Sequence, residues 1–175
     1  MNDHIFIREM QSTDPPVMAV AFCAQGWNKP ESQYQQYLQE HLSGERTVLL
    51  ADVKQQPALL NFSGYLTIVW ESEYPPFRKE RIPEIVDFNV LIKYRRQGIG
   101  NALMDEAERQ IALRSPVAGI GVGLTPDYGP AHILYIKRGY IPDGRGLFFN
   151  NHHLQWGETC MVNDDLTLNF TKLLR

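Results

Sequence analysis

Alternation of apolar and polar residues predicts several β-strands, because the side chains of a strand point to its two faces in turn. The alternation is clearest at Val86, Phe88, Val90 and Ile92. It predicts a strand over 84–92. Weaker alternation, or a high content of β-branched and aromatic residues, predicts further strands over 4–10, 46–53, 59–70, 117–124, 146–149, 159–162 and 166–173.

A four-residue spacing of apolar positions predicts the strongest helix. Ile99, Leu103, Ala107 and Ile111 follow one another at this interval, with charged residues on the other side. We expect this helix over 98–114. Proline in a first turn and glycine after a last turn predict three more helices, over 14–25, 30–42 and 127–138.

The segment 71–83 is expected to lack regular structure, because it holds three prolines among six charged residues. The other strands and helices are interspersed along 175 residues without an internal repeat. They indicate a single domain over 1–175 of the α/β (α+β) class.

Net charge and the length of apolar runs exclude several classes of function. A formal net charge of -3 and a pI near 5.9 exclude a strongly basic nucleic-acid-binding protein. The N-terminus lacks a secretory signal, and no apolar run approaches the roughly 18 residues of a membrane span, so we expect a soluble protein that does not act in a membrane.

Cysteine and histidine usage favours a cytoplasmic protein without a metal. Two cysteines, Cys23 and Cys160, are too few for a disulfide framework, and each is expected to be a buried, inert thiol. His152 and His153 are adjacent, so they point opposite ways in an extended segment and have no further ligand at zinc-like spacing.

The run RRQGIGNA at 95–102 lies between a predicted strand and the strongest predicted helix. Glycines let a phosphate approach the main chain, a helix N-terminus attracts anions, and arginines pair with phosphate oxygens. An ordinary glycine turn with two solvated arginines is the alternative. Neither a nucleotide triphosphatase P-loop nor a complete dinucleotide fingerprint is present, since Leu103 stands where the fingerprint needs glycine or alanine.

Two sequence segments resemble the signatures of one protein family. VLIKYRRQGIG at 90–100 resembles the strand-to-helix signature of the GNAT superfamily of N-acetyltransferases. About forty residues later, AHILYIKRGY at 131–140 resembles that family's second signature, A-x-x-L-Y-x-K-x-G-F. Their order and spacing agree, and the clear match covers 84–140.

The resemblance implies a twisted mixed β-sheet flanked by helices and splayed between its fourth and fifth strands, where acetyl-coenzyme A binds. Loop amides would hold its diphosphate, and the fourth strand would pair with its pantetheine arm. Tyr128 stands where many members carry an asparagine that hydrogen-bonds this arm. The coenzyme-binding residues implied for this chain are Phe88, Asn89, Val90, Arg95, Arg96, Gln97, Gly98, Ile99, Gly100, Asn101, Tyr128 and Ala131.

Acetyl transfer from a thioester to an amine has two proton requirements: the amine must lose a proton, and the departing sulfur must be stabilised. Tyr135 occupies the position of the family's general-acid tyrosine, and a tyrosine hydroxyl stays protonated at neutral pH. For the base, Glu84 resembles the glutamate of the histone-acetylating branch, and Asp87 resembles the acidic residue of members that acetylate small amines. Strand alternation sends these two to opposite faces, so we expect only one to serve.

The acceptor pocket is expected among aromatic residues of the first helices and middle strands, although most large aromatics in a domain of this size are core residues. The segment 71–83 could cover the acceptor or contact the second subunit of a homodimer. The candidates are Trp27, Tyr34, Tyr65 and Trp70.

The predicted function is therefore transfer of an acetyl group from acetyl-coenzyme A to a primary amine, by direct attack in a ternary complex. Acidic residues near the fourth strand favour a small-molecule amine over a basic protein surface. An alternative of a different class is a non-catalytic sensor or interaction module that binds acyl-coenzyme A. A third reading keeps the enzyme but gives it a donor with a longer acyl chain.

Overall fold

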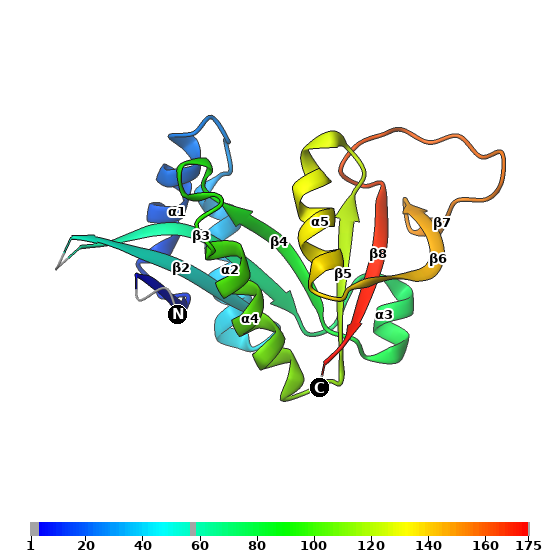
Figure 1. Ribbon diagram of the computed structural model, residues 1–175, viewed down its shortest axis with the longest axis horizontal. Helices are drawn as coiled ribbons and strands as arrows, with labels where there is room; N and C mark the ends of the chain where they lie inside the picture. The colour runs from blue at the N-terminus through cyan, green and yellow to red at the C-terminus, as the bar shows by residue number, and fades with distance from the viewer. Residues whose placement is uncertain (1–3, 57–58, 175) are drawn as a thin grey trace. The chain divides into compact units, whose positions relative to one another are not determined.

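The computed structural model describes residues 4–56 and 59–174, and it divides into two compact units (Figure 1). Unit 1 comprises residues 1–70 and 86–110, and unit 2 comprises 71–85 and 111–175. The described strands form a mixed sheet in the order β1-β2-β3-β4-β5-β8-β6-β7, in which the β4–β5 pair is parallel. The predicted mixed α/β fold is confirmed.

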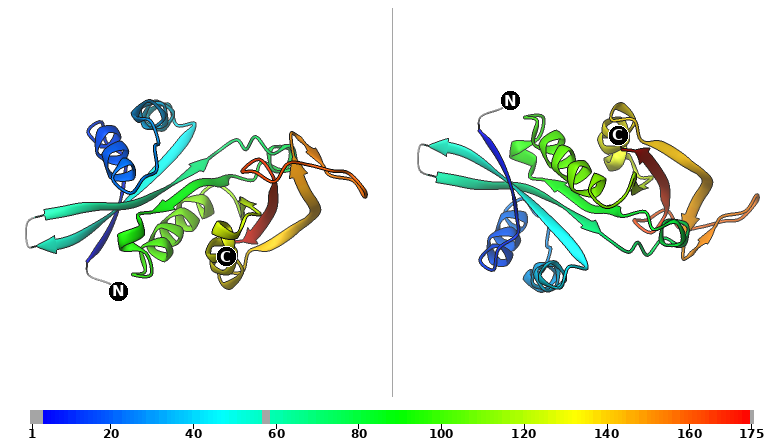
Figure 2. Two further views of the ribbon diagram at one scale, coloured as in Figure 1. Left: turned by 90° about the horizontal axis from the view of Figure 1, so that it is seen from above. Right: turned by 90° about the horizontal axis from the view of Figure 1, so that it is seen from below.

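Unit 1 is built on antiparallel strands β1 (Ile5–Glu9), β2 (Arg46–Gln56) and β3 (Leu59–Val69), followed by the greater part of β4 (Glu84–Val90). Helices α1 (Asp14–Cys23) and α2 (Glu31–Ser43) cover one face of these strands, and α4 (Ile99–Ala112) lies against the other face (Figure 2). The apolar stripe predicted for α4 is buried, which explains why the four-residue spacing identified this helix.

The core of unit 1 contains an aromatic cluster that links α1, α2 and β3. The ring of Phe22 is stacked on Trp27 with centroids 5.8 Å apart, and it meets Tyr65 edge-on at 5.6 Å. Tyr34 meets Tyr65 edge-on at 5.7 Å. Phe22, Tyr34 and Tyr65 are fully buried, so they hold the two helices on the sheet.

Unit 2 contains the beginning of β4 together with β5 (Val117–Gly123), β6 (Ile141–Phe149), β7 (His152–His153) and β8 (Thr167–Leu173). The parallel pairing joins Glu84 to Gly119 and Ile85 to Ile120. Helices α3 (Pro75–Glu80) and α5 (Gly129–Lys137) lie on opposite faces of these strands (Figure 2). Gly119 permits the approach of α3, because a Cβ there would lie 2.4 Å from the ring of Phe77.

Most of the predicted strands and helices are confirmed to within a few residues, and Gly44 ends α2 in the left-handed conformation with a φ of 83°. The helix expected over 127–138 is divided into a 3₁₀ turn at Pro126–Tyr128 and α5. The link expected around 55–57 falls partly outside the described residues.

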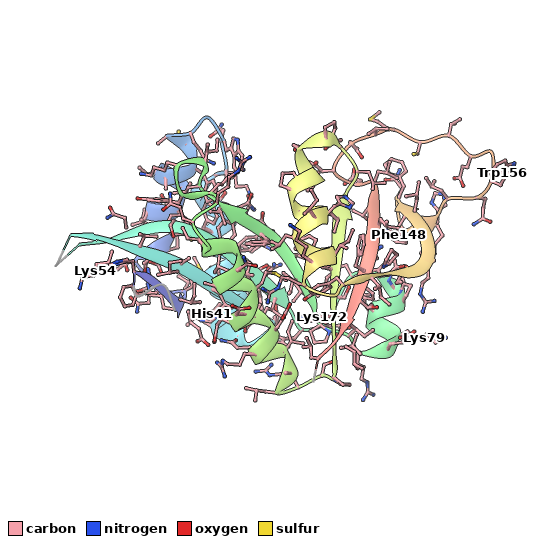
Figure 3. All side chains as sticks on the ribbon, viewed as in Figure 1. His41, Lys54, Lys79, Phe148, Trp156 and Lys172 are labelled. Atoms are coloured by element: carbon pink, nitrogen blue, oxygen red, sulfur yellow. The ribbon has the colours of Figure 1, made fainter. Side chains whose placement is uncertain are left out.

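Three expectations are wrong. Residues 71–83 contain α3, because Pro75 and Pro76 occupy the first helical positions, where proline is tolerated. Residues 159–162 form no strand and belong to an irregular segment, from which Trp156 projects fully exposed (Figure 3). Cys23, the last residue of α1, is exposed, and Cys160, in the irregular segment, is half-buried, so neither is the buried thiol that was expected.

No helix in 4–56 or 59–174 has the length and apolar character that crossing a bilayer requires.

Candidate functional site

The first part of the site is the turn between β4 and α4 in unit 1. Arg96 and Gly98 have positive φ angles of 59° and 89°, with one residue between them. The first intrahelical bond beyond this turn runs from the Ala102 amide to the Gly98 carbonyl at 3.0 Å, so the backbone enters the helix here. Left-handed residues before a helix N-terminus form a concave row of N–H groups, which suits an anion.

Exposure of the turn is compatible with ligand binding. Residues 95–98 are exposed, whereas Ile99 and Tyr94 on either side are buried and anchor the turn. The amide of Tyr94 donates to the Leu91 carbonyl at 2.8 Å, which fixes the end of β4. The predicted diphosphate loop is therefore exposed between two buried anchors, Tyr94 and Ile99.

Arg95 connects the turn to β4 rather than standing free in solvent. Its Nε donates to the carbonyl oxygen of Val90 at 3.3 Å, and its guanidinium carbon lies 5.4 Å from the centroid of the Trp27 ring. Phe88, Asn89 and Val90 are half-buried. The Arg95 side chain thus contacts the backbone that the resemblance assigns to the pantetheine arm.

Asp87 forms the centre of the second part of the site, also in unit 1. Its φ of 49° is left-handed, so the strand bends at this residue. Five side chains donate hydrogen bonds to its carboxylate. They are Lys29 at 2.6 Å and Asn89 at 2.7 Å on Oδ1, and Tyr65 at 2.5 Å, Tyr37 at 3.0 Å and Gln33 at 3.2 Å on Oδ2.

The bend is held from the neighbouring strand by a close backbone approach. A Cβ on Gly64 of β3 would lie 2.6 Å from the Asn89 carbonyl oxygen and 3.0 Å from the Val90 Cα. Only glycine leaves this space empty, so β3 can approach β4 directly after Asp87.

The phenols around Asp87 remain protonated at neutral pH. Burial, together with the nearby carboxylate of Asp87, raises the pKa of Tyr37 to about 12. The same two causes raise the pKa of Tyr65 far above its ordinary value. Both hydroxyls are therefore available as hydrogen-bond donors to the carboxylate.

Lys29 completes this cluster. Its Nζ lies 3.0 Å from the Tyr65 hydroxyl, 5.7 Å from the Phe22 ring centroid and 5.5 Å from the Tyr65 ring centroid. Its side chain is 23% exposed and that of Asp87 is 20% exposed, so the pair lies at the surface of the aromatic cluster. A carboxylate, a phenol oxygen and the face of the Phe22 ring surround one ammonium group.

The aromatic residues that were predicted to line the acceptor pocket differ in their contacts. Tyr65 contacts Asp87, Trp27 lies between Phe22 and Arg95, and Tyr34 packs on Tyr65. Trp70 instead donates from its indole nitrogen to Thr47 of β2 at 3.1 Å.

The sequence analysis missed Lys29, Gln33 and Tyr37. The four-residue spacing of Gln33 and Tyr37 places them on one face of α2, which was a usable signal. Lys29 lies in the segment between α1 and α2, and no local sequence pattern indicated its role.

Glu84 lies in unit 2 and is buried. Its Oε2 accepts a hydrogen bond from the Ser72 hydroxyl at 2.5 Å, and the Ser72 oxygen in turn accepts from the Tyr74 amide at 3.0 Å. Burial raises the pKa of Glu84, while hydrogen bonds from Ser72 and from the Gly121 backbone oppose this effect. Its carboxylate therefore holds the segment that enters α3.

Tyr135 is buried on α5, with its ring 6.0 Å from that of Tyr140 in an edge-on arrangement. Burial raises its pKa above the ordinary value, so its hydroxyl carries a proton at neutral pH. Ala131 lies one helical turn earlier, on the same face.

Tyr128 packs its ring on β5. A Cβ on Gly123 would lie 2.5 Å from this ring, and the Tyr128 hydroxyl donates to Asp164 at 3.0 Å. The hydroxyl that replaces the family's asparagine is thus bonded to a loop of unit 2.

Across the described ranges 4–56 and 59–174, no three His, Cys, Asp or Glu side chains are grouped so that they could hold a metal ion.

Comparison with known proteins agrees with this geometry. Residues 6–140 match the Acetyltransferase (GNAT) family. A search of curated protein sequences gives no significant match.

Solved structures of several acetyltransferases share the fold. Spermidine N-acetyltransferase from Vibrio cholerae, in complex with CoA and spermine, is 12% identical with a TM-score of 0.68, over 99% of this chain and 97% of that one. Ribosomal-protein-alanine N-acetyltransferase from Brucella melitensis is 17% identical with a TM-score of 0.67, over 97% and 99%. The protein yncA from Salmonella typhimurium, solved with its cofactor acetyl-CoA, is 14% identical with a TM-score of 0.66, over 99% and 95%.

The family match covers most of the chain. The chain therefore belongs to the GNAT acetyltransferase family and is an acetyl-coenzyme A-dependent N-acetyltransferase.

Proposed function

We propose that the protein transfers the acetyl group of acetyl-coenzyme A to a primary amine of a small cationic molecule, by direct attack. The observation that carries this proposal is the Asp87 cluster, in which a carboxylate, a phenol oxygen and the face of the Phe22 ring surround an ammonium group. The spermine bound by the Vibrio cholerae structure is a compound of this class and supports the choice.

The turn before α4 provides the coenzyme half of the proposal. Backbone N–H groups at Gly98, Ile99 and Gly100 would hold the diphosphate, with Arg96 adding charge. When bound, acetyl-coenzyme A supplies the thioester whose acetyl group passes to the amine. The protein contributes position and proton management, so no nucleophilic cysteine or serine is required.

Tyr135 is the proposed proton donor for the departing sulfur, the role that the family resemblance implies. A tyrosine hydroxyl holds its proton at neutral pH, as a general acid must at the working pH.

Glu84, Asp87 and water are the candidate proton acceptors, and we propose Asp87. The Asp87 side chain is partly exposed and already binds an ammonium group. Glu84 is buried and holds Ser72, so its conversion to a base would have to disturb the entry to α3.

Acetylation of an amine panel tests the proposed function directly. With acetyl-coenzyme A, mass spectrometry should show one added acetyl group on cationic diamines or polyamines and little on neutral or anionic amines.

Gly98→Ala should weaken coenzyme A binding by about tenfold or more, because alanine in the left-handed conformation costs roughly 1–2 kcal/mol and displaces the turn.

The matched control for this variant is Gly44→Ala. Gly44 has a similar φ of 83° and open space around it, so the substitution carries the same backbone cost away from the turn. Calorimetry should show unchanged coenzyme affinity for this control. Equal affinities for both variants and the wild type, in folded proteins, would remove the turn from coenzyme binding.

Tyr135→Phe should lower kcat by on the order of 10²-fold with little change in coenzyme affinity, because the hydroxyl is lost and the ring is kept. Steady-state kinetics on the best amine of the panel measures this change. A Phe variant with full kcat would show that Tyr135 donates no proton in the rate-limiting step.

The raised pKa of Glu84 predicts a pH-dependent stability. A carboxyl group whose folded pKa exceeds its unfolded value stabilises the folded state below the unfolded pKa, and this contribution is lost as pH rises through the folded pKa. The free energy of unfolding of the wild type, relative to Glu84→Gln, should therefore decrease between pH 4 and pH 8 in urea titrations. A difference that stays constant over this range would contradict the burial account.

A further inference from the structure

We infer that Lys29 is a built-in competitor, whose ammonium group occupies the subsite that receives the ammonium group of the acceptor. This inference rests on the proposed function. Lys29 belongs to the segment between α1 and α2, which has no regular secondary structure. Its Nζ lies 2.6 Å from Asp87, the shortest contact that Oδ1 makes in the cluster.

The groups around Nζ recognise an ammonium group rather than the rest of a lysine. Asp87 supplies charge, the Tyr65 hydroxyl accepts one N–H at 3.0 Å, and the ring of Phe22 presents its face 5.7 Å from Nζ. Ring faces attract cations, and the attraction grows where water is partly excluded. Any primary alkylammonium ion can make the same contacts.

Departure of Lys29 leaves Asp87 well bonded. Tyr65, Tyr37, Gln33 and Asn89 still donate to its two oxygens, so the site keeps its shape. An incoming ammonium ion restores the charge balance that Lys29 provided. The exchange of one ammonium for another avoids leaving a buried carboxylate without a counterion, which is the costly step in most ion-pair losses.

This exchange would act as a filter on acceptors. A cationic amine replaces the Lys29–Asp87 ion pair with an ion pair of its own to Asp87. A neutral or anionic compound cannot form this ion pair. The Lys29 side chain is 23% exposed, so it can leave for solvent without opening the aromatic core. Lys29 would thus raise the KM of a cationic acceptor while excluding acceptors without a charge.

Fragment complementation tests the subsite. Lys29→Ala removes the three methylenes and the ammonium group, which together correspond to n-propylammonium. Bound n-propylammonium should raise the Tm of Lys29→Ala by about 2–4 °C relative to equal sodium chloride, and n-propanol should not. The wild type should show no such rise, and Lys29→Ala/Asp87→Asn should lose it. A folded Lys29→Ala protein without a specific Tm rise would overturn the inference.

Steady-state kinetics distinguishes two roles of Lys29: competition with the ammonium group of the acceptor, and structural anchoring of the segment between α1 and α2. Lys29→Ala should lower KM for a cationic acceptor by about threefold or more with kcat nearly unchanged, and Lys29→Arg should keep KM close to the wild type. An unchanged or higher KM in Lys29→Ala would overturn the competitor role.

Failure of the proposed function would look different. In that case no amine is acetylated by any variant, and the n-propylammonium measurement alone decides the subsite. If Lys29→Ala is too unstable for this measurement, Lys29→Met keeps the apolar stem and lacks only the ammonium group. Ammonium chloride should then raise the Tm of Lys29→Met relative to equal sodium chloride, and a folded variant without this rise would overturn the inference.

Discussion

One carboxylate organises unit 1. Asp87 accepts hydrogen bonds from Lys29 before α2, from Gln33 and Tyr37 on α2, from Tyr65 on β3, and from its own strand through Asn89. A half-buried charge is stable only when its oxygens are well bonded and its charge is balanced. Asp87 therefore ties α2 and the segment before it to β4, beside the aromatic cluster that also holds α1 and α2 on the sheet.

The same strand carries both chemical features of unit 1. β4 bends at Asp87, pairs closely with Gly64 of β3, and ends at the turn where Arg96 and Gly98 adopt left-handed conformations. Asp87 and Arg96 are thus nine positions apart along the chain. The proposed positions of amine and coenzyme both depend on β4 and the turn that follows it.

Sequence reasoning identified the features whose signals are local. The four-residue spacing of α4 and the glycine-rich turn each lie within one run of residues, so pattern alone was enough to predict them. Short helix α3 was missed because prolines at its first positions resemble a loop. Lys29, Gln33 and Tyr37 were missed for a different reason: their importance arises from contacts with residues about fifty positions away, which no periodicity records.

The central claim is that Asp87 holds the Lys29 ammonium group in the ligand-free protein. Correlation of ¹H and ¹⁵N signals from lysine side chains measures this directly, because a held ammonium group exchanges its protons slowly with water. We predict a distinct, slowly exchanging Lys29 signal that is lost in Asp87→Asn and that moves to the position of solvated lysines when a cationic acceptor is added. A Lys29 signal that coincides with those of solvated lysines in the free wild type would contradict the account.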